Sequence, residues 1–294
     1  DGERTSLLID AGPLDPDAGA IILDLFQQLG LSHLDHLMLT HFDADHLGGF
    51  VTTYESTSIV WTSDCTPTTY FPTQAIIDLG DADKETESVD EYQACRNANV
   101  NRLEQGHFVI GQTDNTNVGL QIDLGENYAA TIVAGGGFIV GNETQIGDVD
   151  TENERSLAVL ISGPNGFNFL VMGDLPGVSE VEGDANLELA LGQALQAQSV
   201  DVSILRTGHH GSAESSSAEF LGLVNPEISI ISVGDNSYGH PTCTALQNLF
   251  LYSDPVYQTG LGSPTATCPE QEQVTISNGT IWIRVEGGEF QIGL

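Results

Sequence analysis

The stretch LTHFDADHLGGF, residues 39–50, places two histidines and two aspartates within six consecutive positions and follows them with two glycines. An apolar run that reads as a buried strand leads directly into this cluster. Imidazole nitrogens and carboxylate oxygens are ligands that suit Zn, Mn or Fe, whereas a purely structural cluster would bring repelling carboxylates together without benefit. The stretch therefore predicts a divalent metal site. Its four candidate ligands are His41, Asp43, Asp45 and His46.

The two glycines that follow, Gly48 and Gly49, leave the backbone unusually free. Glycine permits tight turns and a close approach of other backbone segments. We expect this loop to close tightly into a helix whose amino end borders the site.

The charge balance is extreme: 42 acidic and 7 basic residues in 294 give a net charge of -35. Such a surface repels nucleic acid and anionic lipid at low salt, and added salt screens the repulsion. We interpret it as a secreted or salt-adapted surface; a cation-binding or acid-adapted surface is the alternative. No apolar run approaches the ~18–20 residues of a spanning helix, so we expect a soluble chain without membrane insertion.

Four cysteines lie in sequence rich in Thr, Ser, Asn and Gly, and none belongs to a C-x-x-C pair. This pattern favours two disulfides over a zinc finger, and hence an oxidising, secreted or periplasmic location. Chain order suggests the pairs Cys65–Cys95 and Cys243–Cys268, although four cysteines allow three pairings. Four buried thiols are the alternative.

Strand-like and helix-like apolar patterns alternate along the chain, which predicts a single α/β domain over residues 1–294. Residues 64–105 read as an irregular insertion with a helix around 88–99. The tail, 274–294, reads as a hairpin with Asn278-Gly279 as its turn. The expected helices are 17–30, which stops at Gly30, 186–198 and 243–253. The expected strands are 4–12, 34–41, 56–63, 107–111, 118–124, 128–134, 156–163, 168–175, the start of 200–212, and 227–234.

Ligand-competent side chains fall repeatedly at the carboxyl ends of these strands. Besides the 41–46 cluster, they are Asp10, Asp174, the pair His209 and His210, and His240. Sites in α/β proteins form at that edge of a sheet, where loops carry chemistry on a rigid scaffold. The isolated histidines His33, His36 and His107 fit a structural or solvated role, and we assign them none in the site.

The motifs resemble those of the metallo-β-lactamase superfamily. THFDADHLGG is similar to the H-x-D-x-D-H-x-G-G variant found in the β-lactamase-like domain of ComEC DNA-uptake channel proteins and their stand-alone relatives. The likeness continues in order through LLIDAG, NERSLAVLI, FLVMGDL, LRTGHHGS and ISVGDNSYGHP. It implies an αββα sandwich with one or two metal ions between its two sheets. Only six residues precede LLIDAG, so we expect the family's usual first strand to be trimmed or supplied from elsewhere.

The resemblance also implies roles. Asp174 takes the place of the bridging carboxylate, His210 that of the late histidine ligand, and His209 faces the substrate; the reverse assignment of the two histidines stays open. His240 and Ser212 would contact the substrate, and Asp45 would share in catalysis. Asp10 would support the site from below. Asn153 and Ser156 lie where other branches often supply a further histidine. Because Asp43 replaces the usual middle histidine, one metal position favours a harder ion such as Mn²⁺, or stays weak or empty.

These features predict a metal-dependent hydrolase, foremost a phosphodiesterase or nuclease that uses metal-activated water. The substrate would be a small-molecule or nucleic-acid phosphodiester, and the cofactor one or two ions of Zn or Mn, with Fe as a further candidate. One alternative is a hydrolase of another ester, lactone or amide, since fold does not fix substrate. The other is an extracellular binding or assembly protein with a vestigial metal site. The sequence does not set the oligomeric state.

Overall fold

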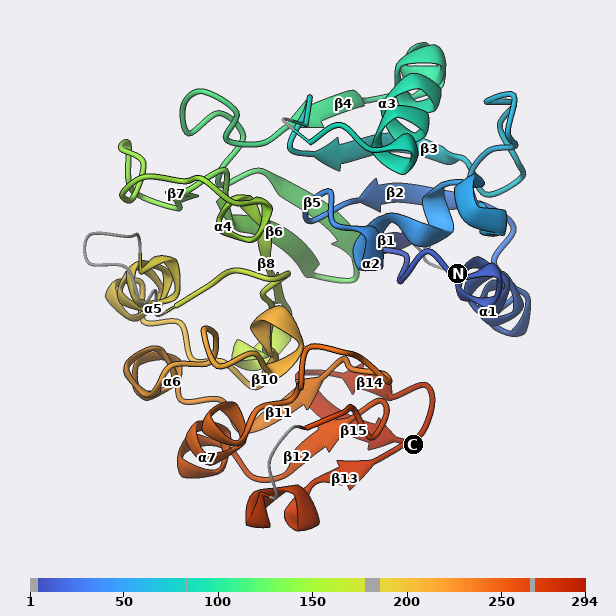
Figure 1. Cartoon of the computed structure of the whole chain (residues 1–294). Coiled ribbons are helices and arrows are strands. Elements are labelled where there is room, and N and C mark those ends of the chain that lie inside the picture. Colours follow the sequence, from blue (N-terminus) through green and yellow to red (C-terminus); the bar gives the residue numbers. More distant parts are fainter. Residues whose placement is uncertain (1–4, 83, 178–185, 265–267) are drawn as a thin grey trace. The chain divides into compact units, whose positions relative to one another are not determined.

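The computed structural model describes residues 5–82, 84–177, 186–264 and 268–294. The chain divides into an N-terminal unit, Asp1–Asn117, and a C-terminal unit, Val118–Leu294, and each is built on its own sheet. In Figure 1 the N-terminal unit runs from blue to teal and the C-terminal unit from green to red. Both units combine strands and helices, so the fold class is α/β, as predicted. In the described part of the chain, no helix has the length and apolar character needed to cross a bilayer.

The N-terminal unit is built on a four-stranded sheet in the order β1-β2-β3-β4. All three neighbouring pairs are parallel, so each strand returns by a crossover rather than a tight hairpin. The long helix α1 ends at Gly30, whose φ of 67° is the left-handed conformation typical of a helix stop, as predicted. The elements of this unit are β1 (Leu7–Ile9), α1 (Pro16–Leu29), β2 (Leu34–Met38), α2 (Ala44–Leu47), β3 (Pro72–Asp78), α3 (Glu87–Asn99) and β4 (Gly106–Val109).

Two expectations for this unit were wrong. Residues 64–105 are no irregular insertion, because β3 lies inside the sheet with β2 on one side and β4 on the other. Residues 56–63 form no strand beyond an isolated bridge between Trp61 and Pro67. Ile59 and Trp61 are nevertheless fully buried, and the Trp61 ring lies 5.7 Å from that of Tyr92. The apolar run marked a buried loop rather than a strand.

A buried ion pair fastens α3 to β3. The fully buried Asp78 accepts hydrogen bonds from Arg96 (3.1 Å), from the Tyr92 hydroxyl (2.9 Å) and from His107 (2.7 Å). Burial favours the neutral acid, but the His107 hydrogen bond and the charges of His107 and Arg96 hold the pKa of Asp78 below its ordinary value. Arg96 also donates to the backbone oxygen of Gly80 (2.6 Å), so the pair fixes the loop that follows β3. His107 thus has the structural role expected for it.

One of the two predicted disulfides is present. Cys65 is bonded to Cys95, which ties the loop before β3 to α3. The predicted Cys243–Cys268 disulfide is absent: both residues are thiols, and the Cys268 thiol lies in hydrogen-bonding contact with Cys243 and donates to Glu270 (3.1 Å). The two thiols are neighbours, as the suggested pairing requires.

We predict that mass spectrometry without reduction finds one disulfide, Cys65–Cys95, and two thiols, of which the buried Cys268 is alkylated only after denaturation. Replacing both Cys65 and Cys95 by Ser should lower the free energy of unfolding by about 2–4 kcal/mol, since the bridge closes a loop with a sequence separation of 30. Urea unfolding measures this loss. The matched Cys243→Ser variant should lose much less, and an equal loss would contradict the assignment.

The C-terminal unit contains a mixed sheet in the order β13-β12-β11-β10-β9-β8-β6-β5, with β7 paired to β6. The pairs β9–β10, β10–β11, β11–β12 and β12–β13 are parallel. The pairs β5–β6, β6–β8 and β8–β9 are antiparallel. The strands are β5 (Gln121–Gly125), β6 (Tyr128–Gly135), β7 (Phe138–Ile139), β8 (Ala158–Ser162), β9 (Asn168–Val171), β10 (Ile204–Arg206), β11 (Ile228–Ile231), β12 (Val256–Gln258) and β13 (Thr275–Ile276).

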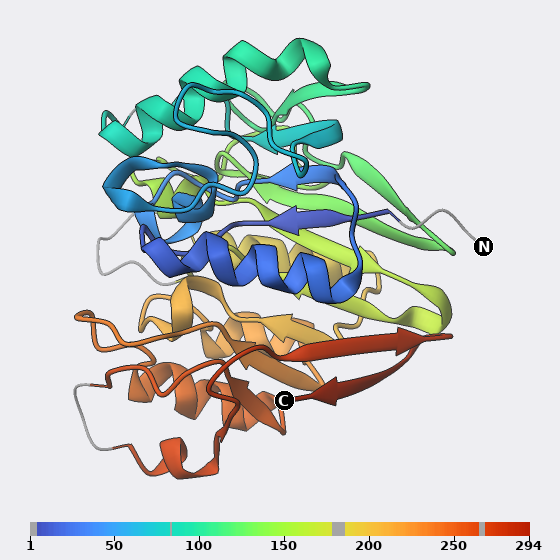
Figure 2. The same cartoon turned by 90° about the vertical axis from the view of Figure 1, so that its right-hand side faces the viewer.

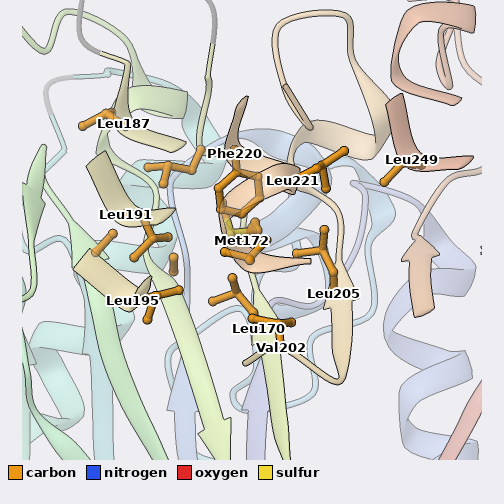
Figure 3. Packing of buried hydrophobic residues seen from close by; sticks show 14 of the residues in the cluster. Leu170, Met172, Leu187, Leu191, Leu195, Val202, Leu205, Phe220, Leu221 and Leu249 are labelled. Atoms are coloured by element: carbon orange, nitrogen blue, oxygen red, sulfur yellow. The ribbon is translucent and has the colours of Figure 1, made fainter. Parts of the chain in front are cut away.

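Helices α5 (Leu187–Ala197), α6 (Ala218–Val224) and α7 (Cys243–Tyr252) cover one face of this sheet. Figure 3 shows the packing: Leu187, Leu191 and Leu195, spaced four residues apart on α5, face the core that contains Leu170 and Leu205 of the sheet. The short helix α4 (Glu152–Arg155) precedes β8. The fold class and the expected helices 186–198 and 243–253 are confirmed.

A hairpin packs on the other face of the same sheet. It consists of β14 (Trp282–Glu286) and β15 (Glu289–Gly293), drawn in red in Figure 2. Its apolar side chains cover the cluster that includes Ile204 and Ile230. The predicted turn at Asn278-Gly279 was wrong, because the hairpin turns at Gly287 and Gly288. Both have positive φ, 59° and 89°, as a two-residue hairpin turn requires.

Glu188, on the first turn of α5, is a fully buried carboxylate. It accepts backbone hydrogen bonds from Ser216 (2.6 Å) and Ser217 (3.0 Å), at the start of α6. Burial raises the pKa of Glu188 to about 7, and the two backbone hydrogen bonds oppose the rise without cancelling it. Glu188 therefore joins two helices through a group that changes charge near neutral pH.

Because the pKa is raised on folding, the contribution of Glu188 to stability is full below about pH 4.5 and is lost as pH rises through about 7. We predict that the free energy of unfolding of the wild type, relative to Glu188→Gln, falls by about 3 kcal/mol between pH 4.5 and pH 8. Urea unfolding across this range measures it, with the exposed Glu219→Gln as the control. A wild-type-minus-Gln difference that stays constant with pH would contradict the prediction.

Candidate metal centre

The N-terminal unit carries the 41–46 cluster just beyond the carboxyl end of β2. His41 and His46 are buried, and their ring centres lie 4.1 Å apart. Asp45, on the first turn of α2, is exposed, and Asp43 is 30% exposed. The cluster thus presents two carboxylates toward the surface above two buried imidazoles.

Asp10 fixes the orientation of His46. Its carboxylate accepts hydrogen bonds from the Thr40 amide (2.8 Å) and hydroxyl (2.9 Å), and lies 2.8 Å from Nδ1 of His46. A carboxylate only accepts, so Nδ1 of His46 carries the proton and Nε2 keeps its lone pair. Asp10 itself has a φ of 59°, which is strained for an aspartate and is held by these bonds. The structure thus places the Asp10 carboxylate in contact with His46 of the cluster.

Gly48 and Gly49 are required by close approach. A Cβ on Gly48 would lie 1.8 Å from the Pro13 oxygen, and one on Gly49 would lie 2.9 Å from Ala11. The amides of both glycines donate to this segment, at Gly12 (2.8 Å) and Ala11 (3.1 Å). The glycines therefore let the segment that follows Asp10 pack directly against the cluster.

We predict that Asp10→Asn weakens divalent-metal binding by about 10–100-fold, since the asparagine no longer fixes the protonated nitrogen of His46. Isothermal titration with Mn²⁺ or Zn²⁺ measures the affinity. The control is Asp35→Asn, which removes a carboxylate that binds Ser6 within the same sheet but away from the cluster. If both variants lose affinity equally, Asp10 acts through stability and not through His46.

Asp43 is positioned differently from the other cluster residues. It lies at the N-cap of α2, yet its side chain makes no capping hydrogen bond there. One oxygen lies 2.5 Å from Nζ of Lys84, and the other lies 3.7 Å from Nε2 of His41. Sequence reasoning missed Lys84, although its being the chain's single lysine was a usable signal.

The C-terminal unit places Asp174 just after β9, where it is 3% exposed. Its amide donates to the hydroxyl of Ser156 (3.1 Å), which is fully buried. The Ser156 amide in turn donates to the oxygen of Asn153 (3.0 Å) on α4. Asn153 and Ser156 therefore support the backbone of Asp174.

His209 and His210 follow β10 in a tight turn, and both have left-handed backbone, with φ of 43° and 51°. Nδ1 of His210 donates to the Ser232 oxygen (2.6 Å), so its Nε2 keeps the lone pair. That Nε2 lies 3.5 Å from an oxygen of Asp174, close to the separation of two ligands on one tetrahedral ion. The corresponding distance for His209 is 3.9 Å.

His240 lies beside this pair, with its ring 5.3 Å from that of His209 and stacked on Tyr238. Asn236 shapes its loop: the Asn236 oxygen accepts from the amides of Tyr238, Gly239 and His240 at 2.9–3.1 Å. Sequence reasoning quoted this motif but gave Asn236 no role. An asparagine that begins a turn was the available signal.

Ser212, predicted to contact substrate, is buried and is bonded within its own turn. Its amide donates to the His209 oxygen (2.8 Å), and its hydroxyl accepts from the Glu214 amide (3.3 Å). These bonds stabilise the turn that carries His209. A contact of Ser212 with substrate stays a prediction.

Each unit thus supplies imidazole and carboxylate groups at its own strand ends. In the N-terminal unit these are His41, Asp43, Asp45 and His46, and in the C-terminal unit Asp174, His209, His210 and His240. Nitrogen and oxygen donors of these types fit Zn or Mn.

Comparison with known proteins gives no matching family model. The chain is similar to two bacterial proteins of known sequence. It is 27% identical over 246 residues to competence protein ComA of Neisseria gonorrhoeae, which covers 82% of this chain and 26% of the relative. It is 33% identical over 113 residues to ComE operon protein 3 of Bacillus subtilis, which covers 38% and 13%. These matches agree with the ComEC-like resemblance of the motifs, and the chain spans about a quarter or less of the length of these relatives.

Solved structures give similarities of low identity. The metallo-β-lactamase fold protein YhfI of Bacillus subtilis has a TM-score of 0.42 at 12% identity, and covers 90% of this chain and 87% of its own. A diphosphatase of the PhnP family has a TM-score of 0.37 at 12% identity, with 92% and 76% covered.

Proposed function

We propose that the chain is a metal-dependent hydrolase of phosphodiesters. In this proposal Asp45 and His46 of the N-terminal unit, together with Asp174 and His210 of the C-terminal unit, hold a divalent ion. All four side chains are imidazoles or carboxylates, which are ligand types suited to a metal ion. Two imidazole nitrogens and two carboxylates suit Zn or Mn, and Fe is a further candidate.

The observation that carries the proposal is the state of the two histidines. Nδ1–H of His46 donates a hydrogen bond to Asp10, and Nδ1–H of His210 donates one to the Ser232 oxygen. Metal-binding histidines are held in this way, with one nitrogen fixed by an acceptor and the other available to the ion. Both histidines have Nδ1 bonded to an acceptor and a carboxylate nearby, and this shared arrangement supports a metal site over a structural cluster.

A divalent ion, when bound, lowers the pKa of its water ligand toward ~7 and so supplies hydroxide near neutral pH. The protein's own groups do the remaining work. Ser156 holds the backbone of Asp174, and Asp10 holds His46. In this proposal His240 and His209, whose rings are 5.3 Å apart, would donate hydrogen bonds to an oxyanion of the substrate.

The substrate class is inferred from the relatives and from the site. The name of competence protein ComA connects that relative with competence, and the ComEC-like resemblance points to DNA, which makes a nuclease the first form of the proposal. A net charge of -35 favours phosphodiesters that are small or are presented at salt high enough to screen repulsion. The Cys65–Cys95 disulfide supports a secreted or periplasmic location.

Hydrolysis of bis-p-nitrophenyl phosphate tests the function. We predict turnover with Mn²⁺ or Zn²⁺ that a chelator abolishes. Asp174→Asn should lower kcat/KM by more than about 100-fold together with metal affinity, because losing a ligand costs more than losing a supporting group. The exposed Asp201→Asn, in the same unit, is the control and should behave as wild type.

Two outcomes would contradict the proposal. Cleavage of p-nitrophenyl acetate without cleavage of the phosphodiester would assign the site to another class of ester. No turnover of either substrate with Mn²⁺, Zn²⁺ or Fe²⁺ would indicate a binding protein without hydrolase activity.

A further inference from the structure

The chain's single lysine, Lys84, lies beside Asp43 of the 41–46 motif, which would hold a second metal ion. Lys84 places Nζ 2.5 Å from an oxygen of Asp43, the residue that replaces the middle histidine of the usual motif. The other Asp43 oxygen lies 3.7 Å from Nε2 of His41. The two residues left over from the proposed four-ligand site, His41 and Asp43, thus already have a cation beside them.

The position of Lys84 is built into the fold rather than left to a free surface chain. Arg96 donates to the Gly80 oxygen (2.6 Å) and to Asp81 (3.1 Å), which fixes the loop soon after β3 ends. Thr86, two residues beyond Lys84, caps α3 by accepting from the Val89 amide (3.3 Å). Hydrogen bonds therefore hold Gly80 and Asp81 before the lysine and Thr86 after it.

The surrounding charge makes this placement informative. The chain has 42 acidic residues and one lysine. A lysine whose only role was to pair with a carboxylate could therefore lie almost anywhere on the surface, yet Lys84 lies beside Asp43. Asp43 is moreover an N-cap residue whose side chain makes no capping bond, so its carboxylate is used for Lys84 instead of for the helix.

We propose that the Lys84 ammonium takes the place of a second metal ion, so that the site binds one ion and Lys84 supplies the second positive charge for an anionic substrate group. This inference rests on the proposed function. A divalent ion on His41 and Asp43 would share the Asp43 carboxylate with an ammonium in direct contact, and like charges at that separation repel strongly. The Lys84 side chain is also 40% exposed, so a phosphate oxygen can approach it.

The test is metal stoichiometry, measured by equilibrium dialysis with Mn²⁺. The wild type should bind one equivalent, and Lys84→Met, which keeps the length of the side chain without its charge, should bind two. Lys84→Arg keeps the charge and should bind one. Arg102→Met removes a positive charge from an exposed position in the same unit and should also bind one.

A kinetic measurement adds a second readout. At one equivalent of Mn²⁺, Lys84→Met should lower kcat/KM on bis-p-nitrophenyl phosphate by about 10–100-fold, the scale of a lost charged hydrogen bond. Excess Mn²⁺ should restore part of this loss in Lys84→Met and leave the wild type unchanged.

Two equivalents in the wild type, or one equivalent in Lys84→Met, would overturn the inference even if hydrolysis is observed. Stoichiometries of one and two without hydrolysis in any variant would support the cation assignment and refute the hydrolase. The two proposals therefore fail separately.

Discussion

The hydrogen bond between Nδ1 of His46 and Asp10 is the constraint on which the candidate site depends. It decides which imidazole nitrogen is available to a ligand, and it holds Asp10 in a left-handed conformation that an aspartate rarely adopts. The segment after Asp10 then packs on Gly48 and Gly49, where no side chain fits. In the C-terminal unit the orientation of His210 is fixed by a different acceptor, the backbone oxygen of Ser232.

Positively charged residues are few in this protein, and two of them, Arg96 and Lys84, form ion pairs with aspartates. Arg96 is buried on Asp78 and fixes the loop that leads to Lys84, and the Cys65–Cys95 disulfide anchors the helix that bears Arg96. Lys84 in turn neutralises Asp43. The disulfide and the Arg96–Asp78 pair thus hold α3, and the Lys84–Asp43 pair sets the charge balance of the motif.

Much of the fold and several features of the candidate site could be predicted from the sequence. Strand ends carrying Asp10, Asp174 and the histidines were found because short local patterns encode them, and Gly30 ended its helix as glycine commonly does. The failures were of tertiary origin: the buried run around Trp61 packs as a loop, and β3 lies in a segment without strong alternation. Partners such as Lys84 for Asp43 and Ser232 for His210 are distant in sequence, so no local pattern reveals them.

The central claim is that His46 and His210 bind the same divalent ion through Nε2. X-ray absorption at the metal edge of the Zn²⁺-loaded protein counts the imidazoles around that ion. The account predicts two imidazoles with oxygen ligands in the wild type, and one in each of His46→Ala and His210→Ala. A wild-type spectrum with one imidazole, or a count that does not change when either histidine is removed, would contradict it.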